Sequence, residues 1–221
     1  LYEGDPADYI TALAALYTES VQLVTVNPDI KSVADLKGKN VSIGAQGSGV
    51  YFNALDFLAA YDMTKDDINA TFESFGQSTE SLKDGKIEAA FVVAGVPTPS
   101  IIELATAKDI YIVSLDEEHV AKLKNICPAY TESTIPAGSY STLKEDALTV
   151  GVKSVIVANE QVTDEQAYTI VKTIFENKDN LAHAKAAELK LDYAAVCGIP
   201  YHPGAAKYFA EKGITVETAS K

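Results

Sequence analysis

Hydrophobic positions follow two different periods along residues 20–130. Short runs rich in β-branched residues are typical of buried strands, and they alternate with stretches in which apolar residues recur every three or four positions, as in amphipathic helices. The strand-like runs lie at 21–26, 41–43, 71–75, 87–94 and 110–115. The helical stretches lie at 32–36, 50–61, 78–84, 99–105 and 116–126. This alternation predicts an α/β fold with a parallel sheet.

The flanking parts of the chain have a different pattern. Residues 7–17 place apolar side chains at helical spacing, and further helices are predicted at 163–175, 180–191 and 204–212. Residues 135–140 are predicted to be a loop, and 148–158 contain a long apolar strand. Two strands, 21–26 and 150–157, therefore bracket an α/β unit, and the rest is mostly helix without a sheet of its own.

A glycine-rich turn links the predicted strand at 41–43 to the helix that begins near Val50. Its sequence is Gly44-Ala45-Gln46-Gly47-Ser48-Gly49, and Ser48 stands where an N-cap residue is expected. The start of a helix offers free backbone N–H groups and the positive end of the helix dipole. The turn therefore predicts an anion site, for a phosphate or a carboxylate.

Composition narrows the choice of anion and partner. The net charge is −13, which argues against nucleic acid and against anionic membrane surfaces. All 18 basic residues are Lys, so no guanidinium is available in this chain to clamp an anion with two hydrogen bonds. Cys127 and Cys197 are compatible with a disulfide or with two free thiols. His119, His183 and His202 form no metal-ligand spacing with either cysteine, so no metal site is expected.

Several sequence blocks together resemble a known family. The blocks are 30–39 (IKSVADLKGK), 44–49 (GAQGSG), 82–91 (LKDGKIEAAF) with 95–97 (GVP), 135–140 (IPAGSY), and 199–209 (IPYHPGAAKYF) with 211–213 (EKG). In this order they resemble the TAXI family, the solute receptors of tripartite ATP-independent (TRAP) transporters. The family's glycine-rich N-terminal segment is not found before Leu1, so the first lobe is expected to be incomplete in this chain.

The resemblance implies a type II periplasmic-binding-protein-like fold with two lobes joined by two hinge strands. Residues 1–27 would be a remnant of lobe I with the first hinge strand, 28–134 a complete lobe II, and 135–221 the second hinge strand with lobe I helices. The resemblance also implies an extracytoplasmic location: the protein would lie in the periplasm, or at the cell surface as a lipoprotein, after cleavage of a signal peptide. The protein would bind a small carboxylate, such as glutamate or a dicarboxylate, between the lobes and deliver it to TRAP membrane subunits. No cofactor and no catalysis are implied.

The residues expected to bind the ligand follow predicted strands or lie near the second hinge. Ser48 and its neighbouring amides are the main candidates, and each of the others has a structural alternative, such as capping, packing or a plain turn. The predicted set is Gly47, Ser48, Gly49, Tyr51, Gln77, Gly95, Pro97 and Tyr140. His202 is expected to be structural, satisfying loop backbone.

The main rival interpretation is an NAD(P)-dependent oxidoreductase of the short-chain type. The turn at 44–49 is close to a dinucleotide-binding turn, and Tyr140 with Lys144 matches a Tyr-x-x-x-Lys pair. No acidic residue follows at the end of the next strand to bind a ribose, and Tyr140 lies in a Pro/Gly loop, so the two side chains would not share a helix face. A regulator's effector domain would need a DNA-binding helix pair and a basic surface, and neither is visible.

Overall fold

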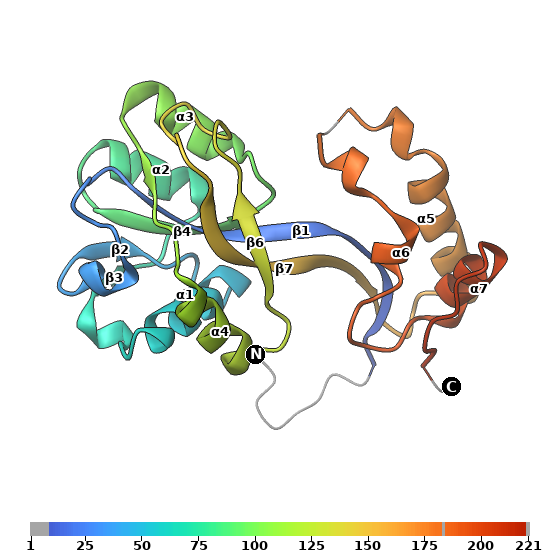
Figure 1. Cartoon of the computed structure of the whole chain (residues 1–221). Helices are drawn as coiled ribbons and strands as arrows, with labels where there is room; N and C mark the ends of the chain where they lie inside the picture. Colours follow the sequence, from blue (N-terminus) through green and yellow to red (C-terminus); the bar gives the residue numbers. More distant parts are fainter. Residues whose placement is uncertain (1–8, 183, 220–221) are drawn as a thin grey trace. The chain divides into compact units, whose positions relative to one another are not determined.

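The computed structural model describes residues 9–182 and 184–219, which form two compact units (Figure 1). The central unit comprises Glu19–Val152, and the terminal unit comprises Leu1–Thr18 with Lys153–Lys221. Two long strands, β1 (Thr11–Thr25) and β7 (Ala147–Ala158), contribute residues to both units. In the part of the chain that is described, no helix is long and apolar enough to cross a membrane.

A mixed sheet organises the central unit. The strand order is β3-β2-β4-β1-β7-β6, and β5 pairs with β1. Strands β2 and β3 are parallel, β2 and β4 are parallel, and β1 runs antiparallel to β4. The remaining strands are β2 (Asn40–Ser42), β3 (Asn69–Thr71), β4 (Ala89–Ala94), β5 (Tyr111–Ile112) and β6 (Thr131–Ile135). The carboxyl ends of β2, β3 and β4 therefore meet at one edge, called here the carboxyl edge.

Helices cover both faces of the sheet in the central unit (Figure 1). On one face, α1 (Gly49–Ala60) and α4 (Glu117–Ile126) pack on a core cluster that includes Val41, Ile43 and Phe91. On the other face lie α2 (Phe75–Lys83) and α3 (Pro99–Ala107), which bury Leu82, Ile101 and Leu104 against β4. Short 3-10 turns, η1 (Val33–Leu36) and η2 (Lys65–Asp67), begin at capping boxes.

The terminal unit has its own apolar core. Helices α5 (Asp164–Glu176) and α7 (Pro203–Glu211) pack together, and their side chains cluster with Ala12, Leu13 and Ala14 of β1. Three short segments complete the unit: η3 (Lys178–Asn180), η4 (Ala184–Glu188) and α6 (Leu191–Ala194).

The predicted α/β class is confirmed, but the sheet is mixed rather than parallel, and two predicted helices are wrong. Residues 11–17 of the predicted helix at 7–17 belong to β1, and residues 7–8 lie outside the described range. Ala12 to Ala15 are consecutively buried because the strand is covered on both faces, which removes the alternation that identifies a strand. The predicted helix at 180–191 is not continuous, because η3 ends at Asn180, η4 covers Ala184–Glu188 and α6 begins at Leu191. Leu189 is the one buried side chain among its described residues. Without a continuous apolar stripe, packing does not hold such a segment helical.

Smaller differences concern boundaries and one missed strand. Strand β6 was not predicted, because Thr131 to Thr134 are polar and the strand lies at the sheet edge. Residues 71–75 were predicted as a strand, but β3 ends at Thr71 and α2 begins at Phe75. The run at 110–115 contains only a two-residue strand, β5.

Candidate functional site

The carboxyl edge of the central unit brings three helix starts together. Helix α1 follows β2, α2 follows β3, and α3 follows β4, so each first turn lies beyond the carboxyl end of a parallel strand. Ligands of open α/β sheets bind outside this end of the strands. Of the predicted residues, Gly47, Ser48, Gly49, Gln77, Gly95 and Pro97 all lie in these loops or first turns.

The turn before α1 is shaped by Gly44. Its φ is +79°, and a Cβ added there would lie 2.7 Å from the Cβ of Val50 and 3.2 Å from Ser48 Oγ, so a side chain is excluded. Ser48 caps the helix as predicted, because its Oγ accepts a hydrogen bond from the Tyr51 amide at 3.2 Å. The turn is therefore held in one conformation in which the start of α1 remains exposed.

The donors that remain at this turn are fewer than the sequence suggested. The Ser48 amide donates to the carbonyl of Ala45 at 3.0 Å, so this donor is already used within the turn. The amides of Gly49 and Val50 have no acceptor within the described residues, as is usual for the first turn of a helix. The Ser48 hydroxyl hydrogen is also available, because Oγ is used there as an acceptor. Gly49 faces open space, since an added Cβ would meet no atom within 4 Å.

Two other predicted residues near this turn already have structural contacts. Tyr51 is partly buried, and its ring contacts those of Phe52 and Phe72 at centroid distances of 5.3 and 6.0 Å. The side-chain oxygen of Gln77 accepts hydrogen bonds from the amide and hydroxyl of Ser74, at 3.0 and 2.8 Å, in the capping box of α2. The amide nitrogen of Gln77 keeps its donor capacity.

The loop after β4 is held by a hydrogen bond to Tyr140. Gly95 is partly buried, and Pro97 is exposed after a cis peptide bond. The Tyr140 side chain is 2% exposed, its hydroxyl donates to Gln22 Oε1, and it accepts from the Thr98 amide at 3.1 Å. Burial raises the pKa of Tyr140. Its hydroxyl is thus engaged on both sides within the protein.

The Tyr/Lys pair of the rival interpretation is not assembled. Tyr140 and Lys144 lie in a stretch of turns between β6 and β7, and Lys144 Nζ donates to the carbonyl of Ser141 at 2.7 Å. A dehydrogenase of the short-chain type needs both side chains on one helix face. The geometry therefore gives the oxidoreductase interpretation no support.

Four polar side chains at this edge were not predicted. Buried oxygen atoms without a hydrogen-bond partner in the described structure are Thr71 Oγ1, Glu73 Oε2 and Ser100 Oγ. Glu19, in β1, is partly buried and has no hydrogen bond or ion pair to any described residue. Glu19 was missed because it lies between the predicted helix at 7–17 and the predicted strand at 21–26, whereas β1 runs through this position.

A family model described as the NMT1-like family matches residues 1–213. The chain belongs to the NMT1-like family. The description does not name TAXI receptors, so membership of that narrower group remains a prediction.

Three solved structures illustrate the similarity of fold. A periplasmic binding protein from Brucella ovis with glutathione bound is 10% identical, with 81% of this chain and 47% of that chain covered and a TM-score of 0.49. The aliphatic sulphonate binding protein SsuA from Escherichia coli is 15% identical, with coverages of 93% and 69% and a TM-score of 0.46. A variant of ArgBP from T. maritima is 15% identical, with coverages of 83% and 61% and a TM-score of 0.49. The chain therefore spans about half to two thirds of these proteins.

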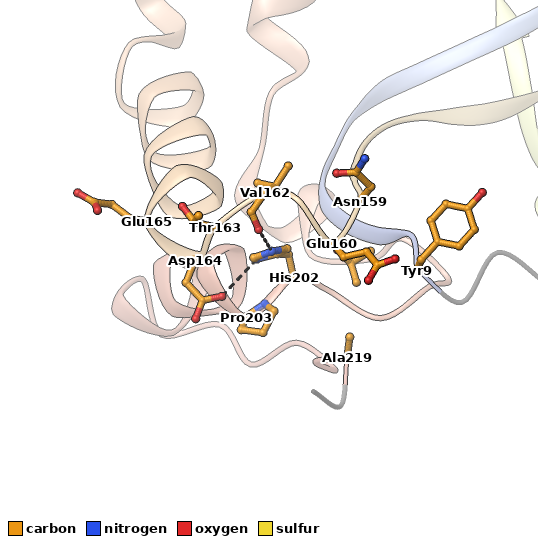
Figure 2. A pocket seen from close by; sticks show the side chains of 11 residues that line it. Tyr9, Asn159, Glu160, Val162, Thr163, Asp164, Glu165, His202, Pro203 and Ala219 are labelled. Carbon is orange, nitrogen blue, oxygen red and sulfur yellow. Dashed lines mark hydrogen bonds and ion pairs between the residues drawn. The ribbon is translucent and has the colours of Figure 1, made fainter.

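In this NMT1-like chain, a second polar surface lies within the terminal unit (Figure 2). An open hollow of about 790 Å³ is lined by Tyr9, Asn159, Glu160 and the first turn of α5. His202 at its base is structural, as predicted: Nε2 donates to the carbonyl of Val162 at 2.9 Å, and Nδ1 accepts from the Gly204 amide at 3.2 Å. Both ring nitrogens are therefore used to hold the start of α7.

Among the described residues, the two cysteines and the possible metal ligands form no disulfide and no metal site at the carboxyl edge or at the hollow of the terminal unit. Cys127 and Cys197 are free thiols in different units. Within residues 9–182 and 184–219, no group of three His, Cys, Asp or Glu side chains is arranged to hold a metal ion. His183 lies outside the described residues.

Proposed function

We propose that this member of the NMT1-like family is an extracytoplasmic solute receptor of a TRAP-type transport system. It binds a small carboxylate, such as glutamate or a dicarboxylate, at the carboxyl edge of the central unit. The observation that carries the proposal is the start of α1, where the Gly49 and Val50 amides and the Ser48 hydroxyl have no acceptor within the described residues. The bound ligand passes to TRAP membrane subunits, from a receptor located in the periplasm or anchored at the cell surface.

A carboxylate matches these donors better than a phosphate does. Two backbone amides and one hydroxyl can serve the two oxygens of a carboxylate, while a phosphate has more oxygens and more charge to satisfy. The chain has no Arg, and its net charge of −13 opposes the approach of a highly charged anion. The unpaired Thr71 and Ser100 hydroxyl oxygens at the same edge support a polar ligand.

The role is binding rather than catalysis. The turn at 44–49 contains glycines, an alanine, a glutamine and a serine, and no histidine or cysteine lies between Ile43 and Thr98. Among the described residues, Ser48 Oγ has no hydrogen bond to a histidine or a carboxylate that could activate it as a nucleophile. Selectivity therefore depends on how well ligand charges match the fixed donors and acceptors.

Replacing Ser48 by Ala tests the proposal. The hydroxyl donor is lost, so affinity for the carboxylate ligand is expected to fall about tenfold, measured by isothermal titration calorimetry after a thermal-shift screen of carboxylates and amino acids. The change also removes an N-cap, which costs about 1 kcal/mol of folding stability. Thr163→Ala is the matched control, since it removes the N-cap of α5 in the terminal unit and leaves the carboxyl edge intact. Equal affinity for Ser48→Ala and Thr163→Ala would overturn the assignment.

A further inference from the structure

We propose that Glu19 binds the ammonium group of the ligand, so that the receptor takes an amino acid and discriminates against dicarboxylates. This inference rests on the carboxylate site proposed at the start of α1. It adds a second point of recognition and narrows the class of ligand.

The register of β1 places Glu19 at the carboxyl edge. Ser20 pairs with Ala94, the last residue of β4, so the next antiparallel position sets Glu19 opposite Gly95. Side chains alternate along a strand, so Glu19 shares a face with Val21 and Leu23. Those two residues belong to the cluster on which α1 packs. Glu19 therefore lies on the α1 face of the sheet, at the level where β4 ends.

Glu19 accepts no hydrogen bond from a described residue, whereas most partly buried carboxyl groups of the central unit do. Asp56 accepts from the Tyr130 hydroxyl at 2.9 Å, Asp67 from the Thr64 amide at 2.9 Å, and Glu88 from the Asn40 amide at 2.8 Å. Glu19 has no such partner among the described residues, and burial raises its pKa. A partly buried carboxylate without a counter-charge is costly, and a ligand cation would offset that cost.

Glu73 shares the lack of a partner but is placed differently. It follows β3, the outermost strand on its side of the sheet, whereas Glu19 lies on β1, next to β4. Only β4 separates β1 from β2, so the lines of those two strands lie about 10 Å apart across the sheet. Along the strands, Ser42 at the end of β2 is level with Ala90 and Glu19 is level with Gly95, and the turn 44–49 and the start of α1 follow beyond the end of β2. A small amino acid with its carboxylate at Gly49 and Val50 can reach Glu19 with its ammonium group. A dicarboxylate would instead bring a second negative charge toward Glu19, with no Arg in the chain to neutralise it.

Pairs of ligands that differ only in the amino group test whether the ammonium group is recognised separately from the carboxylate. Calorimetry with L-glutamate and glutarate, and with other amino acids and their deaminated counterparts, is expected to show at least about tenfold tighter binding of the amino acid. Glu19→Gln is expected to abolish this preference while keeping the thermal unfolding midpoint. The control is Glu103→Gln, which removes one carboxylate from an exposed position of α3 in the same unit and should keep the preference.

The outcomes distinguish this inference from the proposed function. If Glu19→Gln retains the full preference, or if wild-type protein binds the deaminated acid as tightly as the amino acid, Glu19 does not recognise an ammonium group, and the carboxylate site stands. If no member of any pair binds, or if Ser48→Ala binds as tightly as wild type, the proposed function itself is overturned.

Discussion

Two glycine-containing helix starts, one in each unit, look alike in the sequence and differ in the structure. The first is the turn that leads from Gly44 into α1 at Gly49, and the second is the start of α7, from its N-cap His202 to Gly204. At α7 the polar groups are paired internally, because His202 joins the Val162 carbonyl to the Gly204 amide. At α1 the Gly49 and Val50 amides have no acceptor in the described part of the chain. Of these two helix starts, the one at α1 therefore keeps amide donors for the proposed ligand.

The glycines themselves show the same contrast. A Cβ on Gly204 would lie 2.0 Å from the backbone oxygen of Asp164, so this glycine allows α7 to approach α5. A Cβ on Gly49 would meet nothing within 4 Å. A glycine at the start of a helix is thus a packing residue in one unit and leaves open space in the other. Replacing each glycine by alanine adds a single methyl group and tests whether the glycine is needed for packing or for open space.

Gly204→Ala is expected to have the largest effect on folding. The added methyl group overlaps backbone, which cannot move as a side chain can, so the helices must separate. We expect a loss of at least about 3 kcal/mol in the free energy of unfolding, measured by chemical denaturation.

Gly76→Ala in the first turn of α2 is the control for this change. It adds the same methyl group at a position with no neighbour within 4 Å, and it should be neutral or slightly stabilising. Equal stability of the two variants would show that the contact between α5 and α7 is not tight at Gly204.

Local signals predicted helix starts well and missed the long strand. The cap at Ser48 was predicted correctly, because a cap depends on three or four adjacent residues. The first half of β1 depends on contacts distant in sequence. Its run from Ala12 to Ala15 has high helix propensity, and pairing within the sheet overrides that propensity.

The candidate site was predicted in part for the same reason. The turn at Gly44 and the cap at Ser48 are local, so the start of α1 was identified from sequence. Glu19 lies opposite Gly95 only because β1 pairs with β4, and no local pattern contains that pairing. The engagement of Tyr140 with Gln22 and Thr98 likewise joins residues 118 and 42 positions apart.

His202→Ala is expected to have an intermediate effect. It removes the N-cap acceptor of α7 and leaves the Val162 carbonyl without its donor, so about 2 kcal/mol of unfolding free energy should be lost. Ligand affinity should not change, because this residue belongs to the terminal unit's packing. His202→Asn, which keeps an N-cap acceptor, should recover part of the stability. A large loss of ligand affinity in a folded His202 variant would contradict the structural role.

Gly49→Ala is expected to have the smallest effect on folding and a clear effect on binding. Alanine is favoured over glycine within a helix by up to about 1 kcal/mol, and its methyl group meets no atom of the protein, so stability should be equal or slightly higher. The methyl group occupies the space beside the Gly49 and Val50 amides, where the ligand carboxylate is proposed to lie. Calorimetry should therefore show about tenfold weaker binding in a protein that unfolds no earlier. Gly76→Ala adds the same group to the neighbouring helix and should leave affinity unchanged. If Gly76→Ala weakens binding and Gly49→Ala does not, the ligand lies at the start of α2, and the start of α1 is not the anion site.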